Sequence, residues 1–319
     1  MITYNQLKEK PKQFLAATGL KVEEFERILP VFKEKLAASH PPELTKRGTP
    51  RQRRAGAGPK EKLRTDEDKL LFILIYQKTY PIQEMLGLQF EISQPQANYW
   101  IHLLLPILKQ TLAEMGLTPE RDGEAVADSP LVAEAEPDFL IDGTERRRQR
   151  PKDAQKQREH YSGKKKTHTD KNLLLSSSHT KKVLYLSPTV TGKTHDKRVA
   201  DDHPISYPSC STLGKDTGFQ GYEPKGVITF QPKKPKGQEL SQTDRCLNSI
   251  ISGTRISVEN TIAGVKRCRI VKDVFRNTKD GFSDSVMEVA CALHNLRVDC
   301  RHPKPVLLLC QLASFSYYQ

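Results

Sequence analysis

The sequence predicts a mixed α/β domain preceded by an all-α region, and three observations support this fold class. Up to residue 116, outside one basic stretch, apolar side chains recur at helical spacing. After an acidic break, short apolar runs alternate with helical segments, which is typical of a sheet covered by helices. The 319 residues are enough for both parts and the linkers between them.

Shifts in composition divide the chain into consecutive parts. A basic, Gly- and Pro-rich stretch nearly lacks large apolar side chains, so it is either a solvated spacer or, as the charge of the chain favours, an arm that contacts phosphates. The predicted division is a helical lead-in at 1–40, this basic linker at 41–64, a helix-turn-helix region at 65–116, an acidic linker at 117–137, the α/β domain at 138–300 and an unexplained tail at 301–319.

Within residues 65–116 the pattern reads as helix, turn, helix. "IQEMLGLQF" is a short amphipathic helix, "EIS" a turn, and Ser93 a cap for a second helix that tolerates Pro95 in its first turn. A helix that reads the major groove of DNA has this form, although an ordinary helical hairpin has the same periodicity. The polar side chains that such a recognition helix would present early are Gln94, Gln96, Asn98 and Tyr99.

The charge and the apolar runs limit the classes of function. The formal net charge is +13, which indicates a polyanionic partner, with nucleic acid as the first candidate. The longest apolar runs are far shorter than the roughly 20 residues of a membrane span. The N-terminus lacks the apolar core of a secretory signal, so we expect a cytoplasmic protein without a membrane partner.

In the α/β part, two aspartates stand where predicted strands end. Asp142 closes "DFLIDG" and Asp216 follows "CSTLGK", directly before a glycine turn. If the two strands are parallel neighbours, the two carboxylates lie side by side, and such a pair raises a pKa or recruits a divalent cation. Hard oxygen ligands suit Mg²⁺ or Mn²⁺.

A third acid, Glu259, stands alone among cations in "TRISVENTIAGVKRCRI". On a helix, Arg255, Glu259 and Lys266 fall within about 40° of one another, at the border of an apolar stripe formed by Val258 and Val265. Helix geometry alone leaves open an ordinary ion pair with Arg255, worth only about 0.3–0.5 kcal/mol.

Several motifs, in order, resemble the transposases of bacterial insertion sequences in the DDE superfamily, specifically insertion-sequence family five. The motifs are "FLIDGTERRRQRPKD", "REHYSGKKKTHT", "LYLSPTVTGKTHD", "LGKDTGFQG", "RISVENTIAGVKRCRI" and "ALHNLR". Residues 65–116 resemble the helix-turn-helix module that precedes the catalytic domain in one group of that family. The likeness covers roughly residues 10–300.

The resemblance implies an RNase H-like catalytic domain with a mixed sheet. Its catalytic, metal-binding acids would be Asp142, Asp216 and Glu259, and they would hold two divalent cations, Mg²⁺ or Mn²⁺. Arg255 and Lys266 match the arginine and lysine of the family's signature around the glutamate. Ser252 stands where a tyrosine is common, which puts one DNA contact in doubt.

The remaining cations gain an expected role from the same resemblance. Arg255 and Lys266 would neutralise phosphates near the reacting bond, and basic side chains after the first acid would line the DNA path. A solvated basic face is the alternative for this second group, which comprises Arg146, Arg147, Arg148, Arg150, Lys164, Lys165 and Lys166. His195 and Asp196 in "GKTHD" would stabilise a turn or, alternatively, support the metal site from behind its ligands.

The function implied is a DNA transposase associated with a bacterial nucleoid. It would bind terminal inverted repeats, hydrolyse the strand at the element ends and join the 3′-hydroxyl to target DNA, and because it acts on two ends we expect a homodimer or larger assembly on double-stranded DNA. Two alternatives remain at this point: a catalytically inactive DNA-binding protein derived from a transposase, and a divalent-metal nuclease without strand transfer.

Overall fold

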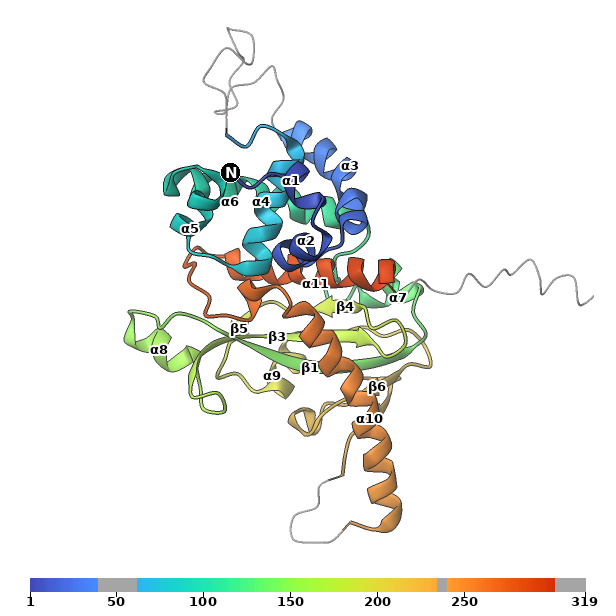
Figure 1. Ribbon diagram of the computed structural model, residues 1–319. Coiled ribbons are helices and arrows are strands. Elements are labelled where there is room, and N and C mark those ends of the chain that lie inside the picture. The colour runs from blue at the N-terminus through green and yellow to red at the C-terminus, as the bar shows by residue number, and fades with distance from the viewer. Residues whose placement is uncertain (40–61, 234–239, 302–319) are drawn as a thin grey trace, which may run out of the picture.

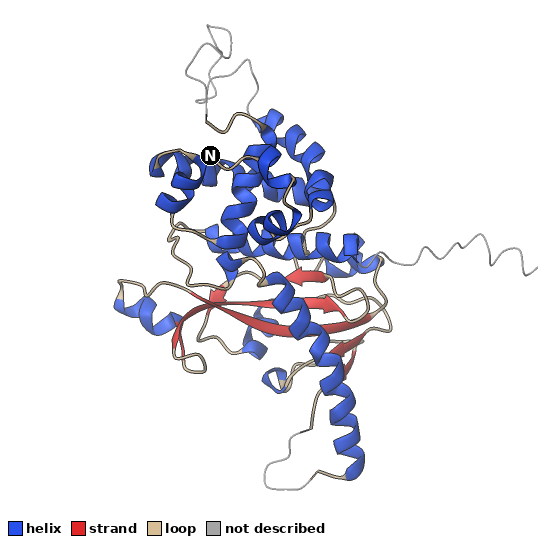
Figure 2. Cartoon of the chain, viewed as in Figure 1, coloured by secondary structure: helices blue, strands red, loops and turns tan. Residues whose placement is uncertain are grey.

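The computed structural model describes residues 1–39, 62–233 and 240–301. Its N-terminal helices form a layer on one side of a sheet that has further helices on both of its faces (Figures 1 and 2). The predicted linker at 41–64 and tail at 301–319 therefore lie almost entirely outside the described residues. The helical layer contains α1 (Tyr4–Lys8), α2 (Pro11–Thr18), α3 (Val22–Ser39), α4 (Asp66–Thr79), α5 (Gln83–Phe90) and α6 (Gln94–Glu114).

The first three helices share a hydrophobic core with the next three. Phe14 and Phe25 are fully buried in the same cluster as Phe72 and Leu104. α11 (Phe282–Arg301) contributes Val289 and its neighbours to this cluster from the other side. The boundary predicted between residues 1–40 and 65–116 therefore does not coincide with a break in packing.

The predicted helix-turn-helix is present as α5, a turn and α6. Glu91 at the turn adopts a left-handed conformation (φ 54°) that lets the chain reverse. Ser93 caps α6 as predicted: its hydroxyl accepts a hydrogen bond from the Gln96 backbone N–H, and the Gln96 side chain accepts one in return from the Ser93 backbone N–H at 3.0 Å. Pro95 lies in the first turn of α6, where its missing N–H has no helical partner to lose.

The sheet is mixed, as predicted. Its order is β2-β3-β1-β6-β7, with β4 and β5 also pairing with β3. β1 is antiparallel to β3 and parallel to β6, which in turn is parallel to β7. The strands are β1 (Asp138–Arg147), β2 (Tyr161–Ser162), β3 (Thr167–Ser177), β4 (Val183–Leu186), β5 (Val190–Thr191), β6 (Thr212–Gly214) and β7 (Ile228–Phe230).

Helices cover both faces of this sheet, and the burial of β3 separates the two faces. Leu174 belongs to the core shared with α11, whereas Leu173 and Leu175 pack in a second core with Val199 and Ala200 of α9 (Asp196–Asp202). α10 (Gln242–Val265) crosses the sheet in Figure 1. The remaining helical segments are η1 (Val126–Asp128), α7 (Pro130–Ala133), α8 (Ala154–His160), η2 (Thr217–Phe219) and η3 (Arg269–Val271).

One strand is longer than expected. The sequence predicts that the first strand ends near Asp142, but β1 continues to Arg147 because β3 keeps pairing with it as far as Arg147↔Thr169. Asp142 therefore lies inside β1, two residues beyond the end of its parallel pairing with β6, whose last registered pair is Leu140↔Gly214.

The "ALHNLR" motif lies on α11 and joins the layers. The Asn295 side chain donates to the carbonyls of Leu117 (3.0 Å) and Val183 (2.8 Å) and accepts from the Val183 backbone N–H (2.8 Å). Arg297 donates to the Gly264 carbonyl on α10 at 2.8 Å. Both side chains are buried, so this motif is structural and fixes α10 relative to the sheet.

Candidate active site

The sheet topology places the two predicted aspartates at equivalent positions. In the parallel pair, Asp138 is opposite Thr212 and Leu140 is opposite Gly214. Continuing this register by two residues puts Asp142 level with Asp216. The prediction that the two strands are parallel neighbours is confirmed.

Local backbone hydrogen bonds orient both aspartates. Asp142 Oδ1 accepts a hydrogen bond from the Gly143 backbone N–H at 2.8 Å. Asp216 Oδ1 accepts one from the Gly218 backbone N–H at 2.7 Å and caps η2. A side chain at Gly218 would put its Cβ 2.8 Å from that same oxygen, so a glycine is required for this close approach.

Glu259 is carried to the same place by α10. Val258 and Val265 are buried beneath the helix, which confirms the predicted apolar stripe. Glu259 itself is exposed and faces the pocket together with Ile262 and Ala263.

The three acids line one pocket of about 550 Å³. Their ligand atoms do not converge as closely as in a formed metal centre, because no group of three that includes them has all its ligand atoms within 4.8 Å among the described side chains. The full lining comprises Asp142, Gly143, Thr144, Glu145, Arg147, Lys164, Lys165, Thr169, Lys171, Asp196, Asp216, Glu259, Ile262, Ala263, Lys266 and Lys272.

Cations surround the carboxylates on this pocket. Lys266 Nζ donates to the Glu145 carbonyl at 3.3 Å. Burial lowers the pKa of Lys266, and the neighbouring Lys165 lowers it further, while Asp142 acts in the opposite direction. Lys164 and Lys165 reach the pocket from the exposed turn before β3, and Lys166 is also exposed on that turn.

The prediction that Arg146 lines an exposed path is wrong. Arg146 is only 3 % exposed, and its guanidinium donates to Asn172 (2.6 Å), to Thr189 (2.9 Å) and to the Ser283 carbonyl (3.0 Å). It lies on the same face of β1 as Asp142, beneath the start of α11, because residues two apart on a strand share a face. The exposed arginine of this run that lines the pocket is Arg147.

The GKTHD motif contributes one residue to the pocket. Asp196 lines it and forms an ion pair with Lys171 at 2.9 Å. His195 is exposed and precedes α9 without a capping hydrogen bond from its side chain. The side chains of Arg255 and Ser252 lie outside the described residues.

The four polar residues predicted to contact DNA from α6 differ in the exposure and the hydrogen bonding of their side chains. The Gln96 side chain is engaged in the helix cap, while Tyr99 is 40 % exposed. Gln94 donates to Gln83 of α5, and Gln83 donates to Asn98 Oδ1 at 3.3 Å. Gln94 and Asn98 line a second pocket, of about 500 Å³, between α6 and the segment at 276–278.

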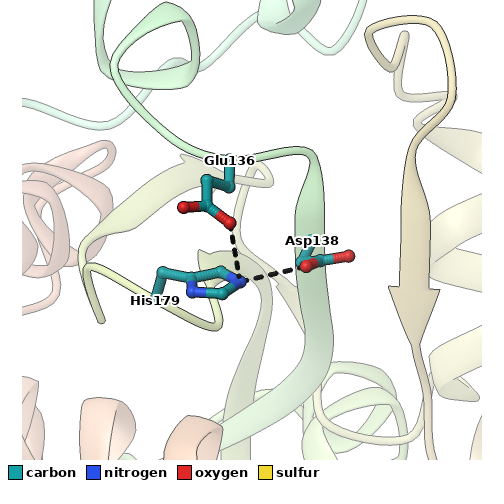
Figure 3. A group of neighbouring side chains, drawn as sticks. All are labelled: Glu136, Asp138 and His179. Atoms are coloured by element: carbon teal, nitrogen blue, oxygen red, sulfur yellow. Dashed lines mark hydrogen bonds and ion pairs between the residues drawn. The ribbon is translucent and has the colours of Figure 1, made fainter. Parts of the chain in front are cut away.

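A separate group of potential metal ligands lies at the other end of β1 (Figure 3). His179 Nε2 is 3.0 Å from Asp138 Oδ2 and 3.4 Å from Glu136 Oε2. Hydrogen bonds from Thr212 and from His179 lower the pKa of Asp138. All three members are substantially exposed, and polar contacts of the His179 ring with the two carboxylates account for their arrangement.

Several residues that line the pocket were not predicted from the sequence, namely Glu145, Lys171 and Lys272. Lys171 and Glu145 face each other across β1 and β3. The sequence carried little signal for Lys171, because it stands between Asp170 and Asn172, ahead of the apolar residues of β3, and only its burial marks it as paired.

Comparisons with known proteins agree with this architecture. Residues 141–295 match the family described as DDE superfamily endonuclease, and residues 61–114 match the helix-turn-helix of DDE superfamily endonuclease. The chain therefore has an N-terminal helix-turn-helix region followed by an RNase H-like catalytic domain with a mixed sheet.

A solved structure and the curated sequences add little. The cryo-EM structure of a piggyBac transposase synaptic complex with hairpin DNA is 10 % identical, with 91 % of this chain and 74 % of that chain covered and a TM-score of 0.42, a likeness too weak to support an inference. No curated protein matches the chain. None of the described helices has the length and apolar composition to cross a membrane.

Proposed function

We propose that this chain is a DNA transposase, because residues 141–295 match the DDE superfamily endonuclease family and residues 61–114 match its helix-turn-helix. It binds the terminal inverted repeats of its element, hydrolyses the phosphodiester bond at each end and transfers the 3′-hydroxyl to target DNA. It acts as a homodimer or larger assembly, because two ends must be processed together.

One observation carries this proposal: Asp142, Asp216 and Glu259 come from two parallel strands and a distant helix to one pocket. Carboxylates gathered among several lysines and Arg147 are suited to phosphoryl transfer, in which charge on the phosphate oxygens must be neutralised. The positive net charge of the chain favours a DNA substrate.

The donor set fits divalent cations. Carboxylate oxygens are hard ligands of the kind that Mg²⁺ and Mn²⁺ prefer, and we assign their binding to Asp142, Asp216 and Glu259. A pair of such ions would supply activation of the attacking oxygen and stabilisation of the leaving oxygen.

The protein's own groups bind and position the DNA. Lys266 and Arg147 contact the phosphates beside the reacting bond, and Lys164 and Lys165 extend this contact to the rim of the pocket. On α6, the exposed Tyr99 and the ordered amides of Gln94 and Asn98 read the repeat. We assign no base contact to Gln96, whose side chain caps the helix.

The test is cleavage of DNA that carries the inverted repeats flanking the gene, by the full chain with Mg²⁺. Asp142→Asn and Glu259→Gln should each reduce nicking at the repeat ends by at least a hundredfold while binding of the repeat DNA is retained. Asp202→Asn, at an exposed carboxylate of α9 outside the pocket, is the matched control and should cleave normally. Undiminished cleavage by both pocket variants would refute the assignment.

The products separate a transposase from its two alternatives. Supplying a supercoiled plasmid should yield joints between the repeat 3′ ends and plasmid DNA. Cleavage without joints would identify a nuclease. Salt-dependent binding without any metal-dependent cleavage would identify an inactive DNA-binding protein.

A further inference from the structure

A buried lysine, Lys171, lines the carboxylate pocket from the α9 side of the sheet. Lys171, in the middle of β3, is only 6 % exposed. It is opposite Glu145 in the β1–β3 register, and by strand alternation it shares the face of Leu173, which packs with α9. Asp142 is opposite Leu174 and faces α10 and α11 instead. Lys171 therefore approaches the site from the opposite face of the sheet.

Lys171 is held in place by an ion pair and a hydrogen bond. Its Nζ is 2.9 Å from Asp196 Oδ1 and donates to the Thr194 carbonyl at 2.6 Å. Glu145 Oε1 is more distant, at 4.0 Å. An ion pair with such limited access to water interacts strongly with nearby charges, because screening by solvent is weak.

Asp196 touches both backbone segments that carry the aspartates. A Cβ at Gly143, the residue after Asp142, would lie 2.6 Å from Asp196 Oδ1. A Cβ at Gly218, whose N–H holds Asp216, would lie 3.1 Å from Asp196 Oδ2. The Asp196 carboxylate thus fills the space that the two absent side chains leave, between the backbone at Gly143 and the backbone at Gly218.

We propose that the Lys171–Asp196 pair sets the charge of the pocket and thereby its affinity for divalent cations. This inference rests on the proposed function. Asp196 is a positioning residue that adds negative charge beside Asp142 and Asp216, and Lys171 compensates that charge so that the folded chain tolerates several carboxylates together. Loss of Asp196 leaves a lysine uncompensated, whereas loss of Lys171 leaves a carboxylate uncompensated.

The two changes therefore have opposite effects on cation binding. Asp196→Asn weakens Mn²⁺ binding, by about tenfold for one unit of charge at a partly screened site. Lys171→Met, which leaves a carboxylate uncompensated, tightens Mn²⁺ binding. The double variant Lys171→Met/Asp196→Asn, which has lost both charges, returns to within about threefold of the wild type.

The experiment is titration of Mn²⁺ into the full chain at pH 8, followed by electron paramagnetic resonance of the free ion, with the thermal melting of each variant recorded in parallel. Lys182→Met and Asp299→Asn are the matched controls, because Lys182 has the same side-chain exposure as Lys171 (8 %) and pairs with Asp299 at 2.7 Å outside the pocket. Neither control should change Mn²⁺ affinity.

The outcomes distinguish this inference from the function on which it rests. Opposite effects of the two single variants, with recovery in the double variant, support it. Equal weakening of Mn²⁺ binding by both single variants, or no change in either, overturns the inference, because an ion pair that only stabilises the fold would not shift Mn²⁺ affinity in opposite directions when each partner is removed. If Lys171→Met does not fold, the isosteric Asp196→Asn and the double variant decide alone. If wild-type Mn²⁺ binding does not depend on Asp142, the proposed metal site itself fails.

Discussion

Whether Gly264→Ala on α10 stabilises or destabilises the protein depends on one contact, with His294. Alanine normally stabilises a helix relative to glycine, by about 0.5–1 kcal/mol. At Gly264, however, the new Cβ would lie 2.4 Å from His294 Nδ1 and 2.5 Å from His294 Cε1. The His294 ring is buried on α11 and its Nε2 is 2.9 Å from the Lys181 carbonyl oxygen, so it cannot turn away without losing that hydrogen bond.

The expected result is a net loss of stability. Overpacking of a filled core costs about 1–3 kcal/mol, which exceeds the gain in helix propensity. We expect Gly264→Ala to lower the free energy of unfolding by about 1–2 kcal/mol, after subtraction of that gain. The measurement is urea unfolding followed by the fluorescence of the single tryptophan, Trp100, which is buried in the core shared with α11.

The same helix supplies the control. Gly253 has nothing within 4 Å of its would-be Cβ, so Gly253→Ala should raise the free energy of unfolding by about 0.5–1 kcal/mol. In a His294→Ala background the cost of Gly264→Ala should disappear. A Gly264→Ala protein stabilised as much as Gly253→Ala would refute the close packing of α10 on α11.

Three further predictions concern other parts of the chain. Burial lowers the pKa of His294 to about 4 from a value of 6.5, so protons bind the unfolded chain preferentially as the pH falls from 7 to 4. The free energy of unfolding, measured by urea titration, should therefore drop by up to about 3 kcal/mol across this range. The variant His294→Asn should show a weaker dependence of stability on pH. Ser93→Ala, which removes the cap of α6, should cost about 1 kcal/mol in the same assay, whereas Ser93→Gly should cost only a few tenths. Arg146→Leu should destabilise the fold by about 3 kcal/mol, because it leaves the buried partners of Arg146 unpaired. Lys165→Ala, at an exposed position, should leave stability unchanged and reduce the slope of DNA affinity against salt concentration by about 1. The opposite pattern, with stability lost in Lys165→Ala and unchanged in Arg146→Leu, would contradict the burial of Arg146 and the exposure of Lys165.

Features that depend on neighbouring residues in the chain were predictable from the sequence. The cap at Ser93, the turn at Glu91 and the apolar stripe of Val258 and Val265 all follow from helix geometry and from the chemistry of free backbone amides. The two aspartates were identified because each stands where a predicted strand ends. That they are level with each other required a further assumption, that their strands are parallel neighbours.

Tertiary structure decided how each side chain near the site is used. A run of arginines reads as one basic surface, but β3 pairs with β1 as far as Arg147, and the alternation of the strand then buries Arg146 and exposes Arg147. Lys171 and Asp196 are 25 positions apart in the chain, and only the packing of α9 on the sheet makes them an ion pair. Burial and pairing depend on which face of a strand meets another layer, and that depends on register and layer order, which are properties of the folded sheet rather than of any local stretch of sequence.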